Sequence, residues 1–356
     1  MPSAIADRRR PLVPSFAVKL NDKPLANDIA LWITSVVVED ELDYPSMFTL
    51  HLISKEDERS TDAWTDDPRL QLGATVELSM GYAGAALDTL IIGDITGLEP
   101  TFSVGGPPTL LLRGYDRRNR LNGVRRYFPF PKGKDSEIAR QVCQNIVDVE
   151  PTDSRVAHDG IVQNQQTNLE FLIDRAGKIG YELAMAGTKL LFRPIANKKP
   201  AFATLTLNDD LLEFRPRLSL QPVTEVVSVA WDPKQKAPIT ASANADSIPA
   251  MDDKKLGAKV AAGVIGGAVE RLPGTLVASQ AEANQLAAGK LNTAALKYIT
   301  GDGTARGRTD LRAGTVIELR GLGKTFDGSY YIKSAVHRYS PRAGYLTDFR
   351  VARNAS

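Results

Sequence analysis

The sequence has little of the chemistry on which many enzymes and secreted scaffolds depend. Its 356 residues contain one cysteine, Cys143, and three histidines. A single cysteine excludes an internal disulfide framework and is typical of assembly in a reducing cytoplasm. Because the residues before Cys143 have the pattern of a helix, we interpret it as a small buried apolar residue and not as a reactive thiol.

Long apolar runs and a charge imbalance are missing as well. No uninterrupted apolar stretch approaches the ~20 residues that a membrane-spanning helix needs, and the nearest candidate, 260–269, is short and rich in glycine. Residues 1–11 lack the apolar core of a signal peptide and predict a solvated, arginine-containing tail. The 44 basic and 42 acidic side chains give a net charge of +2, which favours neither nucleic acid nor an anionic membrane as a partner.

Motifs that resemble cofactor sites lack the surroundings that their chemistry needs. Residues 321–325 end like a phosphate-binding loop, but Glu318 stands where that loop needs its first glycine, and no helical pattern follows. Residues 263–268 do not have the spacing of a dinucleotide-binding turn. We therefore expect no cofactor, and a hairpin loop at 321–325.

The histidines are too scattered to predict a metal site. His51, His158 and His337 lie far apart and show no ligand spacing with one another or with the cysteine. The alternating pattern around His337 predicts a half-exposed strand position. We expect no bound metal.

Paired carboxylates are the remaining candidates for catalysis. A glycosidase needs two carboxyl groups roughly 5–10 Å apart across a cleft. We interpret the acids at 39–41 and at 209–210 as solvated residues of turns that flank strands. The sequence thus predicts no catalytic residues and no enzyme, with a cell-wall hydrolase kept as an alternative.

Apolar and polar residues alternate through residues 31–130. Ile95 and Leu98 on one side of the turn at 105–108, and Leu110 and Leu112 on the other, have the pattern of a hairpin with one buried face. Short strands separated by Gly, Pro and Asp are typical of a barrel or sandwich. The acidic stretch 55–68 predicts a surface loop.

The pattern changes in the middle of the chain and then returns. Helical periods begin near residues 135 and 168, and a hairpin is expected over 181–193. Residues 233–273 show little periodicity and are interpreted as a flexible or interaction loop. The spacing of Ser279 and Glu282 predicts a capped helix over 279–296.

These patterns together predict a mainly β fold with an α+β middle. We expect an N-terminal tail at 1–30 and a first β-barrel-like domain at 31–130. A small α/β domain at 131–197 separates it from a second β-barrel-like domain at 198–356, into which the helix is inserted.

A cluster of arginines and aromatic residues closes the first β region. Its simpler interpretation is a solvated strand end with aromatic side chains tucked into the core. The second hypothesis is a protein interface, because Arg and aromatic side chains are favoured there. The candidate interface residues are Arg117, Arg118, Arg120, Arg125, Arg126, Tyr127, Phe128 and Phe130.

Three segments in order carry a family resemblance. They are 98–121 with its Arg113-Gly114-Tyr115-Asp116 motif, 168–194, and 314–339. In this order they resemble the phage late control D family. Its members are baseplate hub proteins of contractile tails and contractile injection systems, akin to the hub part of type VI secretion VgrG proteins. The resemblance extends over most of the chain, from about residue 31 to residue 353.

The resemblance implies a structural function. Hub proteins of this family form homotrimers whose two similar β domains per subunit build a ring of pseudo-sixfold symmetry. One face of the ring matches the hexameric inner tube and the other holds a trimeric spike. The expected partners are therefore the spike protein, the inner tube protein, other baseplate components and a cargo effector.

The resemblance also implies where the protein is assembled, and one alternative function remains. Such a subunit is assembled in the cytoplasm as part of a phage tail or injection particle, with neither membrane insertion nor sequence-specific nucleic-acid binding. Because the sequence ends just after the last hub strand, we expect a separate spike protein to dock there. A monomeric carbohydrate-binding module is the second alternative.

Overall fold

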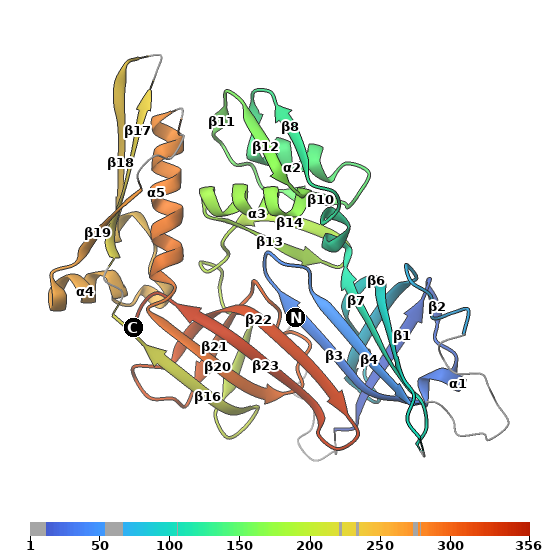
Figure 1. Ribbon diagram of the computed structural model, residues 1–356. Helices are drawn as coiled ribbons and strands as arrows, with labels where there is room; N and C mark the ends of the chain where they lie inside the picture. The colour runs from blue at the N-terminus through green and yellow to red at the C-terminus, as the bar shows by residue number, and fades with distance from the viewer. Residues whose placement is uncertain are drawn as a thin grey trace.

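The computed structural model is mainly β, with a small α/β unit placed by the middle of the chain (Figure 1). It describes residues 12–53, 67–104, 106–220, 223–232, 235–272, 277 and 279–356. The expectations for the tail at 1–11 and for most of the loop at 55–68 fall outside these residues. The predicted mainly β class is confirmed. In the described part of the chain, none of the helices has both the length and the apolar character to cross a membrane.

One large sheet joins the two ends of the chain. Its N-terminal strands are β1 (Pro14–Leu20), β2 (Lys23–Pro24), β3 (Ile33–Glu41), β4 (Met47–Ile53), β5 (Thr75–Tyr82), β6 (Asp88–Thr101) and β7 (Thr109–Asp116). Its C-terminal strands are β15 (Ala203–Thr206), β16 (Leu211–Leu218), β20 (Ile299–Arg306), β21 (Val316–Arg320), β22 (Gly328–Ser340) and β23 (Gly344–Arg353). The order is β16-β20-β23-β22-β3-β4-β7-β6-β5-β1-β2. Off this path, β21 pairs with β22, and β15 pairs with β21.

The N-terminal unit, β1 and β3 to β7, curls around one apolar core. In β4 the side chains of Phe48, Leu50 and Leu52 are buried and alternate with half-buried neighbours, because successive side chains of a strand point to opposite faces. The sheet curls so far that Phe16 of β1 packs on Tyr339 of β22, with 5.1 Å between their ring centroids. The helix α1 (Asn27–Ala30) follows β2.

The C-terminal unit, β15, β16 and β20 to β23, repeats this plan and shares a strand ladder with the first. The start of β22 pairs with β21, while its residues 334–339 pair antiparallel with residues 36–41 of β3. We call this second ladder the seam. Among the described strands, hydrogen bonds close neither unit into a complete barrel.

The α/β unit separates the two β units in sequence. It contains β8 (Arg126–Phe130), β9 (Gly133–Lys134), α2 (Asp135–Cys143), β10 (Val149–Pro151), β11 (Ala157–His158), β12 (Ile161–Gln166), α3 (Asn168–Ile179), β13 (Tyr181–Ala186) and β14 (Lys189–Pro194). Thr167 caps α3 in a capping box with Glu170, and Gly180 ends it in the left-handed region at φ 68°. The two predicted helices and the hairpin are confirmed.

A projecting arm replaces the loop expected at 233–273, so that prediction is wrong. The arm is built from β17 (Val223–Asp232), β18 (Ala237–Asn244), α4 (Gly257–Ile265), β19 (Ala268–Leu272) and α5 (Gln280–Ala295) (Figure 1). The buried positions of β18 include Ala241 and Ala243, which face the arm's helix side. Because alanine contributes so little apolar contrast, the alternation of this strand is hard to recognise in the sequence.

The helix predicted over 279–296 is α5, and Ser279 Oγ accepts the backbone N–H of Glu282 at its start. It packs against α3 through two glycines. A Cβ added to Gly289 would lie 2.6 Å from the backbone nitrogen of Gly180, and one added to Gly180 would lie 2.8 Å from Gly289 Cα. Backbone therefore meets backbone at this point, which sets the distance between the arm and the α/β unit.

We expect Gly289→Ala to lower the free energy of unfolding by about 1–3 kcal/mol, because the new methyl group has no space. The control is Gly177→Ala on α3, where an added Cβ meets nothing within 4 Å. That change should be neutral or stabilising by up to ~1 kcal/mol, since alanine is the better helix former. Urea unfolding of both variants measures the difference, and equal midpoints would contradict the close approach of the two helices.

Candidate partner interface

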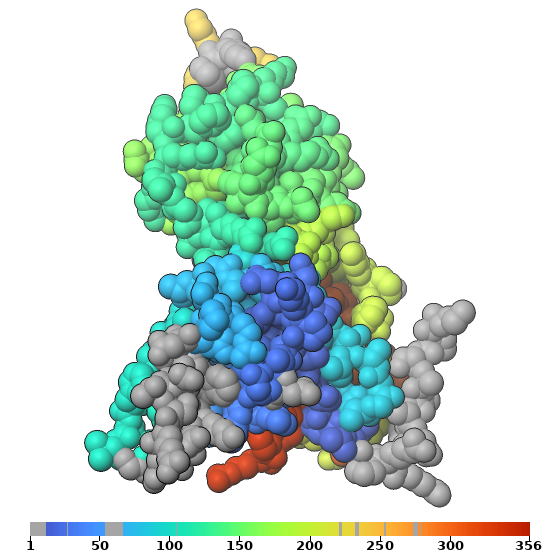
Figure 2. All heavy atoms as spheres, turned by 90° about the vertical axis from the view of Figure 1, so that its right-hand side faces the viewer, coloured from blue at the N-terminus to red at the C-terminus, as the bar shows by residue number. Residues whose placement is uncertain are grey.

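Arg118 lies where the three units of the chain meet. Its guanidinium donates to Asp116 Oδ2 at 2.7 Å, to Ser46 Oγ at 2.8 Å and to the backbone carbonyl of Leu183 in β13 at 3.2 Å. The side chain is completely buried. Figure 2 shows the α/β unit (green) seated on the N-terminal unit (blue), and this contact ties the two together.

The same hydrogen-bonded chain continues into the C-terminal unit. Ser46 Oγ donates to Asp40 Oδ1 at 3.2 Å, and Arg312, in the segment before β21, donates to Asp40 Oδ2 at 2.6 Å. Burial opposes ionisation of Asp40, but the Arg312 guanidinium holds the pKa of this carboxyl below its usual value. Asp40 therefore stays charged, and its hydrogen bonds with Ser46 and Arg312 connect the two β units.

A second set of buried contacts joins the α/β unit to the C-terminal unit. Arg193 of β14 donates to Glu182 Oε1 at 3.0 Å and to the carbonyl of Gly314 at 2.8 Å. The hydroxyl of Tyr331 in β22 donates to the other oxygen of Glu182. Burial raises the pKa of Glu182. Both sets of contacts hold the three units in a fixed arrangement.

Two of the eight predicted interface residues are internal, so their assignment is corrected. Arg118 belongs to the buried chain just described. Phe130 is 3% exposed and stacks on Phe171 of α3, with 5.3 Å between ring centroids. Asp116 accounts for the inward turn of Arg118, since it caps the 3-10 helix η2 (Arg117–Leu121) and pairs with the guanidinium. In the sequence, the position of Asp116 two residues before Arg118 was the available sign that this arginine could be paired internally.

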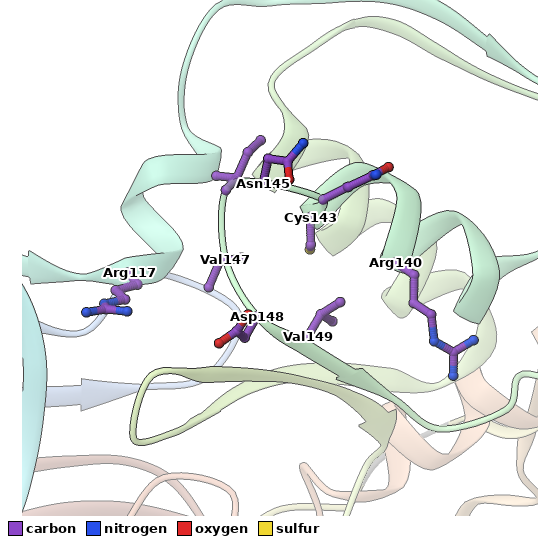
Figure 3. Close-up of a pocket in the computed structure, with 9 residues that line it drawn as sticks. Arg117, Arg140, Cys143, Asn145, Val147, Asp148 and Val149 are labelled. Atoms are coloured by element: carbon purple, nitrogen blue, oxygen red, sulfur yellow. The ribbon is translucent and has the colours of Figure 1, made fainter.

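The other members of the cluster reach the surface, and their role as an interface stays a prediction. Arg120 pairs with Asp94 at 2.6 Å, and Arg125 pairs with Glu170 of α3. Tyr127 and Phe128 are 63% and 38% exposed, and the guanidinium of Arg126 lies 5.6 Å from the Phe128 ring centroid. The remaining member, Arg117, borders a hollow near the end of α2 (Figure 3).

The surface of the C-terminal unit carries charge pairs next to the seam, which we call the charged face. Arg215 pairs with Glu213 at 2.7 Å, Arg217 with Asp302 at 3.1 Å, and Arg338 with Asp348. The last two pairs join neighbouring strands, where opposite charges stabilise a sheet modestly, whereas Glu213 and Arg215 both lie on β16. A hollow of about 330 Å³ opens among these residues.

The acids at 39–41 do not lie in a turn, so that interpretation is corrected. They are the last residues of β3, where side chains alternate between faces. Glu39 and Glu41 line the hollow in the charged face, whereas Asp40 points into the interior. Burial raises the pKa of Glu41, and the neighbouring Glu39 and Asp40 add to the shift. The acids at 209–210 do lie in a turn, where Asp210 pairs with Arg308 at 2.7 Å.

His337 is fully buried at the seam, so the predicted half-exposed position is wrong. Its Nδ1 lies 2.9 Å from the hydroxyl of Tyr345, and burial lowers the pKa of His337 to about 4. The reason is tertiary, because Tyr345 of β23 and the segment before β21, with Leu311 and Arg312, lie around the ring. Among the described residues, no group of three or more His, Cys, Asp or Glu side chains is arranged to hold a metal ion.

Sequence reasoning missed a buried charge cluster between the α/β unit and the arm. His158 Nε2 lies 2.8 Å from Asp135 Oδ2, and its Nδ1 lies 3.0 Å from Glu282 Oε1 of α5. Arg175 of α3 donates to the other oxygen of Asp135 at 2.6 Å. Burial opposes the charged imidazole, but hydrogen bonds to the two carboxylates raise the pKa of His158 to about 9. The four residues are far apart in sequence, so no local motif could reveal them.

Two further predictions are confirmed. Residues 321–325 form the loop between β21 and β22, with Gly321 and Gly323 in the left-handed region at φ 83° and 84°. Cys143 is 1% exposed at the end of α2, and burial raises the pKa of its thiol to about 12. A thiol with such a pKa stays protonated and unreactive at neutral pH.

Comparison with known proteins places this fold among tail proteins. A family model described as the Alg8 N-terminal domain matches residues 11–340. No curated protein sequence matches the chain. A similar solved structure is the 43 kDa tail protein of prophage MuSo2 from Shewanella oneidensis, with 17% identity and a TM-score of 0.72, covering 96% of this chain and 98% of that one.

Two further solved structures are also similar. The Escherichia coli c3393 protein, described as a type VI secretion component that resembles the T4 tail proteins gp27 and gp5, has 13% identity and a TM-score of 0.62 over 95% of this chain and 77% of that one. A chain of the Francisella PdpA–VgrG complex has 8% identity and a TM-score of 0.55 over 98% and 54%. The resemblance to hub proteins is thus confirmed at the level of the fold.

We expect Arg118→Ala to lower the free energy of unfolding by about 3–5 kcal/mol, because Asp116 would remain buried without its counter-charge. The matched control is Arg120→Ala, which breaks the surface pair with Asp94 and should cost less than ~1 kcal/mol. Chemical denaturation compares the two variants. Similar losses for both would mean that Arg118 is not the anchor described here.

His158 should make stability depend on pH between 6.5 and 9. Its pKa is about 9 in the folded chain and 6.5 ordinarily, so its stabilising contribution is complete below pH 6.5 and is lost as the pH rises through 9. The difference in unfolding free energy between the wild type and His158→Gln should therefore shrink from pH 6 to pH 9. His51→Gln on β4 is the control, and an unchanged difference for His158→Gln would contradict the cluster.

Proposed function

Because this chain belongs to the family of the Alg8 N-terminal domain and has the fold of a phage tail protein, we propose that it is a structural subunit of a phage tail or contractile injection particle. Within that particle it acts as the baseplate hub subunit. It forms a homotrimer that adapts the hexameric inner tube to the trimeric spike.

The observation that carries this proposal is the pair of β units joined at the seam. Each unit is a curled sheet of six main strands, and residues 334–339 of β22 pair with residues 36–41 of β3. Three such chains around a threefold axis present six similar β units. A ring of this kind has threefold symmetry in sequence and near-sixfold symmetry in shape, which is what an adaptor between a tube and a spike requires.

The proposed division of the chain is 31–130, 131–197 and 198–356, except that β1 (Pro14–Leu20), expected in the N-terminal tail, belongs to the first unit because it pairs with β5. Separate apolar clusters support it. The cluster of the N-terminal unit includes Phe48 and Leu78, that of the α/β unit includes Phe171 and Phe192, and that of the C-terminal unit includes Tyr330. Separate cores allow the β units to form the ring while the α/β unit and the arm stay available for other partners.

The proposed role is structural and not enzymatic. Two of the carboxylates that were candidates for hydrolysis are engaged in ion pairs, namely Asp40 with Arg312 and Asp210 with Arg308. Incubation of the purified chain with peptidoglycan tests the alternative, because release of soluble fragments would favour a tail-tip hydrolase. The expected partners are the spike protein, the inner tube protein, other baseplate components and a cargo effector, in a particle assembled in the cytoplasm.

Exposed leucines on β16 offer one side of a contact between subunits. Leu212 and Leu218 are 48% and 42% exposed on this outermost strand of the sheet. Pro216 lies between them and cannot donate a backbone hydrogen bond, so side-chain packing is the available mode of contact. Leucines on an otherwise polar surface are typical of a protein interface.

We expect native mass spectrometry to detect a trimer, formed by the chain alone or on co-expression with the spike protein. The double variant Leu212→Glu with Leu218→Glu should shift the mass to that of a monomer, because charges at the contact oppose association. Val124→Glu is the control, since Val124 is 88% exposed on the loop before β8. A monomer under both conditions for the wild-type chain would refute the hub proposal and favour a monomeric binding module.

A further inference from the structure

The hollow beside Arg117 is a polar depression on the α/β unit. It has a volume of about 370 Å³ and lies between η2, the end of α2 and the segment that leads into β10 (Figure 3). Cys143, Ile146, Val147 and Val149 form its apolar part. The polar groups around it come from Arg117, Arg140, Gln144, Asn145 and Asp148.

Two guanidinium groups at this hollow form no ion pair with any described residue. Arg117 and Arg140 form no ion pair or hydrogen bond through their side chains with any described residue, and Arg117 Nε is shielded from solvent without an acceptor. Several nearby arginines differ in this respect, because Arg118, Arg120, Arg125 and Arg175 each pair with a carboxylate. A buried donor without an acceptor costs free energy, which a ligand oxygen can recover.

The other polar groups of the hollow are also available for binding. The side chains of Gln144, Asn145 and Asp148 make no hydrogen bond to a described residue. Asn145 adopts the left-handed conformation, φ 63°, in the turn that follows α2. The hollow therefore offers two cationic groups, two amides and one carboxylate above an apolar floor.

We propose that this hollow binds an acidic segment of a protein partner. One Asp or Glu side chain of the segment pairs with Arg117 at one edge of the hollow, and a second pairs with Arg140 at the opposite edge (Figure 3). Guanidinium groups bind carboxylates through paired hydrogen bonds. Backbone N–H groups of the segment donate to Asp148 and to the amide oxygens of Gln144 and Asn145. The aliphatic part of the segment packs on Val147 and Val149.

The lining favours a peptide carboxylate over a phosphate or a nucleic acid. Asp148 would repel a phosphate, whereas it accepts hydrogen bonds from a peptide backbone. The end of α2 at Cys143 presents the negative pole of the helix dipole, which also disfavours a dianion. The net charge of +2 supplies no basic surface of the kind that nucleic-acid binding needs.

This inference goes beyond the hub function and does not depend on it. The hollow is made entirely by one chain, so a monomer binds the segment as well as a trimer does. Its failure would leave the trimer intact, and absence of a trimer would leave the hollow intact.

The test uses the full chain and two synthetic peptides, acetylated and amidated at their ends. The acidic peptide is Ala-Glu-Val-Asp-Ala and the neutral one is Ala-Gln-Val-Asn-Ala. Nuclear magnetic resonance titration at millimolar peptide should shift the Arg117 Nε–H signal and the backbone amides of 144–149 in a saturable way with the acidic peptide. Arg117→Gln and Arg140→Gln should each weaken binding about tenfold, as expected for a charge-assisted hydrogen bond.

The control variant is Arg342→Gln, which removes an exposed arginine from the turn between β22 and β23 and should leave the affinity unchanged. Arg140 is exposed, so Arg140→Gln should fold normally and keeps the test decisive even when Arg117→Gln unfolds. Equal binding of the neutral peptide, absence of saturable shifts, or stronger binding of inorganic phosphate than of the acidic peptide would each overturn the proposal.

Discussion

The arrangement of this protein depends on one buried chain of hydrogen bonds, from Arg118 through Asp116, Ser46 and Asp40 to Arg312. Each of the three units contributes to it or is touched by it, the α/β unit through the carbonyl of Leu183. Buried charges are costly unless each is compensated, so the chain is favourable only when all three units take their native positions. The main effect of the network is therefore to fix how the units pack together, and its net contribution to stability is smaller. Buried polar groups have this effect when they favour one packing arrangement over several others.

Around that anchor, β22 determines the shape of the molecule. It is long enough to pair with β21 at its start and with β3 at its end. This one strand therefore contributes to the C-terminal unit and also pairs with the N-terminal unit. The two β units cannot rotate independently, because turning one of them would break the seam and expose His337 beneath it. A rigid pair of similar units is the property on which the proposed adaptor depends, and the charged face next to the seam keeps the pair soluble while leaving its outer surface free for partners.

The arm and the α/β unit are attached differently from the β units. Their contact combines the backbone approach of Gly180 and Gly289 with the cluster of His158, Asp135 and Glu282. The glycine contact sets the distance between the arm and the α/β unit, since no side chain fits there. The His158 cluster sets their relative orientation, since its hydrogen bonds are directional. Arg140 lies on the α/β unit and the neighbouring Arg117 on η2, which precedes it. Neither residue belongs to the seam, so a partner bound there does not compete with the β contacts of a ring.

Local patterns in the sequence determined the strands, both helices of the α/β unit and the capped helix α5, because alternation, helical period and capping involve residues only a few positions apart. The alanine-rich strand β18 escaped detection, since small apolar side chains give little contrast. The tertiary structure alone decided that Arg118 and Phe130 turn inward and that His337 is covered. It also decided that β22 joins β3, which pairs Ser334 with Glu41. Pairing of strands so distant in sequence is set by the whole core, and no local pattern encodes it.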